Sequence, residues 1–83
     1  MKVSHNTRLF VTKLNQAGFS DVRGHNKACD TTIIVNGVVE FKMLGGYDPI
    51  LSHVTPGYEM LAKTLVKATG ASDVAGYIGI PTR

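Results

Sequence analysis

The stretch CDTTIIVNGVVEFKM, residues 29–43, decides the fold of this chain. It holds two short apolar runs, residues 31–35 and 38–43, which are rich in β-branched side chains and therefore predict two β-strands. Asn36 and Gly37 stand between them, and this dipeptide is typical of a tight turn between antiparallel strands. We therefore predict a β-hairpin at the centre of the fold.

Three charged residues stand in this hairpin, with Asp30 at its start and Glu40 and Lys42 near its end. Two carboxylates with convergent side chains make an oxygen-rich site suited to Mg²⁺ or Mn²⁺. Lys42 shares a face with Glu40 because side chains alternate along a strand, so it could orient or deprotonate a water molecule. The trio therefore indicates metal-assisted hydrolysis of a phosphodiester, with all three residues as catalytic candidates.

The length of the turn decides whether the trio shares one face of the sheet. A two-residue turn at 36–37 would set Glu40 opposite Ile33, and Asp30 would then point to the other face. A three-residue loop at 35–37, with its glycine left-handed in a bulge, would pair Lys42 with Asp30 and bring Glu40 to the same face. The opposite face would then be almost wholly apolar, formed by Thr31, Ile33, Val39, Phe41 and Met43. We favour the three-residue loop because it separates polar from apolar side chains better.

Two other stretches have the apolar spacing of amphipathic helices. The first spans residues 6–17, and Gly18 stands where a left-handed stop residue is expected. The second follows Thr55, which we expect to cap it with Pro56 in the first turn, and it ends at Gly70. Each helix would bury its apolar face against the sheet.

The remaining segments predict two further strands and two loops. Alternating side chains favour strands at 19–23 and 73–80, whereas the polar stretch 24–29 and the stretch 44–54, with its Gly-Gly and Pro, read as loops. The predicted order is helix, three strands, helix and strand, which indicates an α/β fold whose sheet is covered on at least one face.

Asp30, followed after a short turn by Glu40-Phe41-Lys42, resembles the Asp…Glu-x-Lys signature of the PD-(D/E)xK nuclease superfamily. The predicted element order is similar to the core of that superfamily over nearly the whole chain. The Asn-Gly interval resembles phage junction-resolving endonucleases, EFKMLGGYDPILS resembles small stand-alone VRR-NUC nucleases, and LNQAGFSDVRG is similar to archaeal junction resolvases. The resemblance implies a single domain over residues 1–83 with an αβββαβ, restriction-endonuclease-like core, in which two helices flank a small mixed sheet.

The same resemblance implies a site and an activity. It assigns Asp30 and Glu40, with the carbonyl of Phe41, to a Mg²⁺ or Mn²⁺ ion, and it assigns Lys42 to the attacking water. The implied function is that of a metal-dependent endonuclease that hydrolyses phosphodiester bonds in duplex or branched DNA, including junctions.

The chain departs from the superfamily pattern in three places. Cys29 stands where proline is frequent, and the first predicted helix has no acid, with Thr7 nearest to the expected position. Tyr58 and Glu59 are the nearest candidates for the polar residue common on the following helix. These departures leave open a non-catalytic accessory or inhibitor protein of phage type, which would bind nucleic acid or a host protein. A third alternative is a structural homo-oligomer with Ile50, Leu51 and Val54 in its interface.

Composition limits the possible classes of protein. The chain has 83 residues, of which 43% are hydrophobic and 18% charged, so we expect one globular domain with a thin core, and association into a dimer would extend that core. No apolar run is long enough to span a bilayer. Cys29 is the only cysteine, which excludes an internal disulfide and fits the cytoplasm of a bacterial or phage-infected cell.

Nine Lys and Arg against six Asp and Glu give a net charge of +3, a mild preference for an anionic partner such as DNA. Each cation alone is also consistent with an ordinary solvated surface. The candidates for contact with phosphates are Arg8, Arg23, Lys27, Lys63 and Lys67. Tyr47, beside Gly45 and Gly46 in the predicted loop, could stack on a base. The three histidines, His5, His25 and His53, show no metal-ligand spacing.

Overall fold

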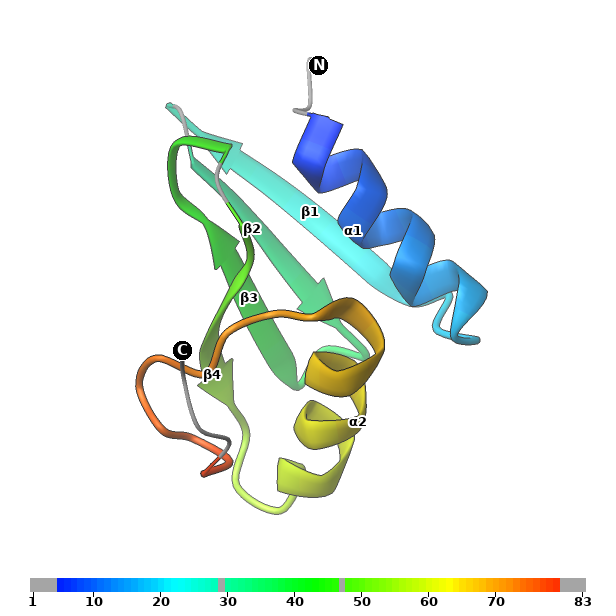
Figure 1. Cartoon of the computed structure of the whole chain (residues 1–83), viewed down its shortest axis with the longest axis vertical. Helices are drawn as coiled ribbons and strands as arrows, with labels where there is room; N and C mark the ends of the chain where they lie inside the picture. The colour runs from blue at the N-terminus through cyan, green and yellow to red at the C-terminus, as the bar shows by residue number, and fades with distance from the viewer. Residues whose placement is uncertain (1–4, 29, 47, 80–83) are drawn as a thin grey trace.

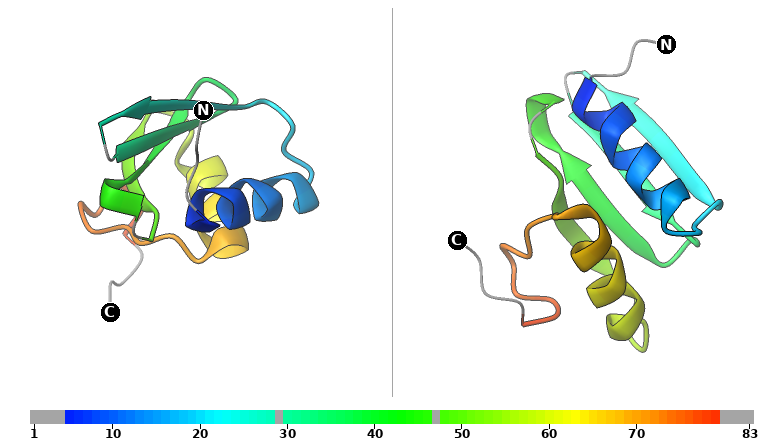
Figure 2. Two further views of the ribbon diagram at one scale, coloured as in Figure 1. Left: turned by 90° about the horizontal axis from the view of Figure 1, so that it is seen from above. Right: turned by 45° about the vertical axis from the view of Figure 1, so that its right-hand side comes forward.

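The computed structural model describes residues 5–28, 30–46 and 48–79. Four strands form one antiparallel sheet in the order β1-β2-β3-β4, with a helix before the first strand and another after the last (Figure 1). The elements are α1 His5–Gln16, β1 Val22–Lys27, β2 Asp30–Val35, β3 Val39–Met43, the short 3₁₀ helix η1 Leu44–Gly46, β4 Ile50–Val54 and α2 Glu59–Thr69. Both helices lie on the same face of the sheet (Figure 2).

The α/β class is confirmed, but the predicted order of elements is wrong in several places. Residues 24–27, expected in a loop, belong to β1, and residues 50–54, expected in a loop, form β4. Leu51 and Val54 are buried there, so apolar alternation outweighed the preceding glycines and proline. The chain therefore runs αββββα through an antiparallel sheet, instead of αβββαβ through a mixed one.

The strand predicted at 73–80 does not form over residues 73–79, and Ile80 lies outside the described residues. A single parallel bridge joins Ser72 to Ile50. Beyond it the chain turns, because Gly76 and Gly79 have φ values of 76° and 71°, which lie outside the extended region.

The hairpin between β2 and β3 has the predicted three-residue length but starts one residue later than predicted. Its loop is 36–38, closed by a hydrogen bond from the Val38 N–H to the Val35 carbonyl (3.1 Å). Asn36 and Gly37 are both left-handed, with φ of 53° and 72°, so the predicted conformation of Gly37 is confirmed. The predicted apolar face is also confirmed, since all five of its residues are buried.

This apolar face packs against both helices and forms the core. Phe10 and Leu14 of α1 are buried on it, and the rings of Phe10 and Phe41 meet edge to face with centroids 5.0 Å apart. Ala62 and Leu65 of α2 complete the same cluster. Two layers, one of strands and one of helices, therefore leave the second face of the sheet without a helix over it among the described residues (Figure 2).

The ends of the helices agree only partly with expectation. Gly18 and Gly70 have the left-handed conformation predicted for stop residues, with φ of 95° and 77°. Thr55 does not cap α2; it accepts a hydrogen bond from the Tyr58 N–H in a turn before the helix. Within residues 5–28, 30–46 and 48–79, neither helix has the length and apolarity required to cross a membrane.

Candidate functional site

The open face is the surface of the sheet turned away from both helices, and the strand registers define its side chains. Thr31, Ile33 and Val35 of β2 are buried beneath the helices, so the alternate residues of β2 and their cross-strand partners point outward. Strand alternation and register assign to the open face Arg23, His25, Lys27, Asp30, Thr32, Ile34, Glu40, Lys42, Ile50 and His53.

Basic residues on this face form a line along β1. Arg23, His25 and Lys27 are exposed at every second position, so their Cα atoms are about 6.6 Å apart along the strand. Lys42 is two strands away, at roughly 10 Å from β1. Arg23 forms an exposed ion pair with Asp21, with 3.3 Å between Nε and Oδ1, whereas Lys27 and Lys42 form none with any residue that the structure describes.

Both carboxylates of the open face accept hydrogen bonds from neutral donors. Asp30 Oδ1 accepts from the Gly45 N–H of η1 (2.7 Å). Glu40 Oε2 accepts from the Ser52 hydroxyl of β4 (2.8 Å). Lys27 is opposite Asp30 in the register, yet the carboxylate is bonded to Gly45. A backbone N–H of η1 therefore orients Asp30, and a side-chain hydroxyl of β4 orients Glu40.

The register does not assemble the predicted metal site. Lys42 pairs with Thr32, not with Asp30, and Glu40 pairs with Ile34. Strand alternation assigns Asp30 to the face of Glu40, but the Asp30 carboxylate is bonded to Gly45 of η1, and the two acids are four residues apart along the strands, a separation of about 13 Å. One cation needs its ligand oxygens at about 2.0–2.6 Å. The residues therefore do not fit a shared Mg²⁺ or Mn²⁺ ion, and the described chain contains no group of three or more His, Cys, Asp or Glu that could hold a metal.

The shift has a local cause in the loop. With both Asn36 and Gly37 left-handed, the loop begins after Val35, so β3 is displaced by two residues relative to the predicted pairing. A displacement by two retains the face of every side chain while it changes every cross-strand partner. Phe41, whose carbonyl was the predicted third ligand, pairs with Ile33, and its side chain lies in the core.

The five predicted phosphate contacts do not share one surface. Arg23 and Lys27 lie on the open face, whereas Arg8 is on α1 and Lys63 and Lys67 are on α2. Sequence reasoning considered a substrate contact for His25 but placed it in a loop, assigned no role to His53, and gave Lys42 a catalytic role only. The alternation of Arg, His and Lys at 23, 25 and 27 was the signal that could have identified β1 as a cationic strand.

Most of the remaining predicted site and interface residues lie away from the open face or outside the described residues. Thr7 is buried and donates a hydrogen bond to Met43 Sδ (3.5 Å), so it does not face a site on the open surface. Leu51 and Val54, predicted at an oligomer interface, are buried within a single chain, and this prediction is wrong for both. Tyr58 and Glu59 lie exposed at the start of α2. The predictions for Cys29 and Tyr47 lie outside the described residues.

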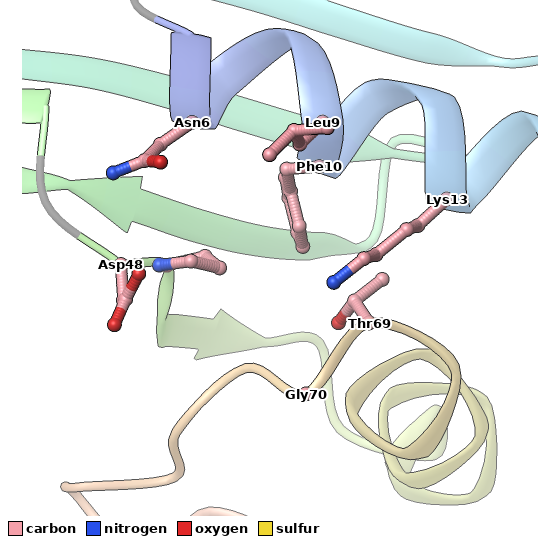
Figure 3. A pocket seen from close by; sticks show the side chains of 8 residues that line it. Asn6, Leu9, Phe10, Lys13, Asp48, Thr69 and Gly70 are labelled. Atoms are coloured by element: carbon pink, nitrogen blue, oxygen red, sulfur yellow. The ribbon is translucent and has the colours of Figure 1, made fainter.

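A cavity of about 200 Å³ lies between α1, the end of α2 and residues 48–49 (Figure 3). Lys13 and Asp48 project at opposite sides of it, and both are exposed. Charges of both signs at solvent-exposed positions do not select one class of ligand.

The sequence matches no protein-family model, and neither a curated protein nor a solved structure matches it.

Proposed function

We propose that this chain is a non-catalytic nucleic-acid-binding module whose open face contacts the phosphate backbone. The observation that supports the proposal is the uncovered sheet face with Arg23, Lys27 and Lys42 exposed on it, the two lysines outside any ion pair among the described residues. His25 and His53 add two hydrogen-bonding side chains to the same face. Cationic and polar side chains on an exposed surface are the groups that contact phosphate oxygens.

The chemistry of the open face favours contact with the backbone over reading of bases. None of the strand residues that the register assigns to it is Phe, Tyr or Trp, so the rings that these residues offer to bases are the two small imidazoles of His25 and His53. Phe10 and Phe41, the rings that contact each other, are buried on the opposite side. We therefore expect weak discrimination between sequences and a strong dependence of affinity on salt.

Removal of both open-face lysines tests the proposal. In the double variant Lys27→Ala/Lys42→Ala, affinity for a labelled single-stranded or duplex oligonucleotide should fall. The slope of log K against log salt should decrease by about 0.7–0.9 for each lost contact. The measurement is fluorescence anisotropy over a series of salt concentrations.

The matched control is Lys63→Ala/Lys67→Ala, which removes the same charge from α2, an element that contacts α1 and β4. Its salt slope should stay near that of the unmodified protein. Equal losses in the two variants would show attraction to net charge without a defined face. An unmodified protein that binds no oligonucleotide at low salt would exclude the function outright.

A metal-dependent nuclease is the second candidate, and one observation favours it: Glu40 and Lys42 lie on the same face of the sheet. The spacing of Asp30 and Glu40 disfavours it, as described above. We expect supercoiled, branched and single-stranded DNA to stay intact during incubation with the protein and Mn²⁺, and we expect its melting temperature to be the same with Mn²⁺ as with a chelator. A cation that binds the folded protein and is present at a concentration a hundred times its Kd would stabilise the fold by about 2.7 kcal/mol, which a thermal melt detects.

Cleavage that needs Mn²⁺ and disappears in both Glu40→Gln and Lys42→Ala would replace the binding proposal by the nuclease. Each substitution is tested in its own variant. Cleavage by a contaminating nuclease would persist in both preparations, so loss of cleavage in both assigns the activity to this chain.

A further inference from the structure

A different surface lies at the outer edge of β1, on the side of the sheet that faces α1. β1 is an edge strand, bonded to β2 on one side and to no other described strand. Between β1 and α1 runs a groove of about 230 Å³ with a mostly apolar lining that includes Val11, Val22 and Ile33. Arg8 lines the α1 side of the groove. An unpaired strand edge therefore lies beside an apolar groove.

Gly24 keeps this groove open. It is exposed in the middle of β1, and its backbone does not have the positive φ that would require glycine. A Cβ atom at this position would lie 3.3 Å from Cδ1 of Ile33, a residue that lines the groove. Glycine weakens a strand by roughly 0.5–1 kcal/mol relative to alanine, and within strands it often marks the close approach of another backbone or ligand. Glycine therefore leaves space for the Ile33 side chain across the strand pair, and the same missing Cβ keeps the β1 side of the groove clear.

We propose that β1 accepts an extended segment of a partner protein as an additional strand, and that this segment alternates acidic and aliphatic residues. Backbone groups along a free edge supply the affinity of such strand addition, and side chains at alternate positions supply its selectivity. One set of side chains would enter the groove against Val11 and Val22. The other set would lie beside Arg23, His25 and Lys27, so acids complement it.

A second copy of this chain is a poor occupant of the same edge. Antiparallel pairing of β1 with its own copy, in the register centred on residue 25, would set Arg23 opposite Lys27. Like charges directly opposite each other destabilise a strand pair. Lysines on an edge strand also commonly prevent such self-pairing. The charges of β1 therefore select an acidic segment over a copy of β1, and this docking does not depend on nucleic-acid binding by the open face.

The probe is a fluorescein-labelled, acetylated and amidated peptide of three Glu-Val repeats, which equals β1 in its six residues. Saturable binding by anisotropy is expected, with slower hydrogen exchange of β1 amides in the complex. A peptide of identical composition with three Glu followed by three Val should bind at least about tenfold more weakly, because its side chains do not sort to the two faces. A peptide of three Lys-Val repeats should not bind.

Gly24→Val fills the groove without a change of charge. It should weaken binding of the alternating acidic peptide at least about tenfold. Because its Cβ would lie 3.3 Å from Ile33 Cδ1, a thermal melt first establishes that the variant is folded. Lys27→Glu should lower the affinity for the same peptide, whereas Lys67→Glu, the matched change on α2, should leave the affinity unchanged. The second pair of variants tests the docking even if Gly24→Val does not fold.

Equal binding of the alternating and block peptides would overturn the proposal. So would a complex in which the peptide slows hydrogen exchange only at amides that do not belong to β1. So would a dimer in light scattering that Gly24→Val dissociates, because the occupant would then be a second copy. Gly24→Val leaves the open-face side chains unchanged, so oligonucleotide binding by this variant separates failure of the docking from failure of the proposed function.

Discussion

Replacement of Phe41 by alanine should lower the free energy of unfolding by about 3–5 kcal/mol, the range for removal of a buried aromatic side chain. Phe41 is fully buried at the centre of β3, where it pairs with Ile33 on one side and Leu51 on the other. It also supplies the edge-to-face contact with Phe10 that joins α1 to the sheet. Alanine would leave a cavity where both helices meet the strands.

The expected loss is large for a chain of this size. Stabilities of about 0.05–0.15 kcal/mol per residue correspond to roughly 4–12 kcal/mol for 83 residues, so the variant would be marginal or unfolded. Urea denaturation followed by circular dichroism measures the change. Met60→Ala is the control, because its side chain is 76% exposed and should alter stability by no more than about 0.5 kcal/mol. A loss below about 1 kcal/mol at Phe41 would contradict the assigned core.

Asp73→Ala should cost about 1–3 kcal/mol, although Asp73 belongs to no helix or strand. The residue is 3% exposed, and its two oxygens accept hydrogen bonds from the Tyr77 N–H (2.8 Å) and the Ile78 N–H (3.0 Å). Alanine removes both acceptors and leaves two partly buried donors to find water. The carboxylate therefore determines the course of residues 73–79.

Urea denaturation measures this loss, and hydrogen exchange at the amides of Tyr77 and Ile78 locates it. Asp73→Asn provides the graded comparison, because the amide retains one acceptor oxygen of nearly the same shape and should cost less than alanine. If both substitutions leave stability and exchange unchanged, Asp73 does not hold the segment in place.

The sequence predicted what depended on local pattern. The hairpin, its left-handed Gly37 and its apolar face followed from β-branched alternation and one Asn-Gly turn. β4 was missed because Gly45, Gly46 and Pro49 precede it, although Leu51 and Val54 carry the spacing of buried strand residues. The last predicted strand failed because the Asp73 carboxylate accepts hydrogen bonds from the amides of Tyr77 and Ile78, a local side-chain-to-backbone contact that side-chain alternation does not encode.

The site was less predictable than the fold because it depends on register. Asp30, Glu40 and Lys42 were expected on one face; the register places Glu40 and Lys42 together, whereas the Asp30 carboxylate is bonded to Gly45 of η1. Their separation along the strands was set by where the loop begins, at Asn36 instead of Val35, and turn propensity does not distinguish these two starts. A signature that fixes residue types and spacing in sequence therefore did not fix spacing in the sheet.

The two edges of the sheet differ in a way that limits how many molecules can join it. At β4 the edge is occupied: the Leu51 N–H donates to the Ser72 carbonyl (2.8 Å), and the Tyr77 hydroxyl donates to the Ser52 carbonyl (2.7 Å). Open-ended growth of strand-paired sheets needs two available edges on each molecule. With one edge closed by its own chain, this protein should form complexes of one-to-one stoichiometry and should not propagate into fibres.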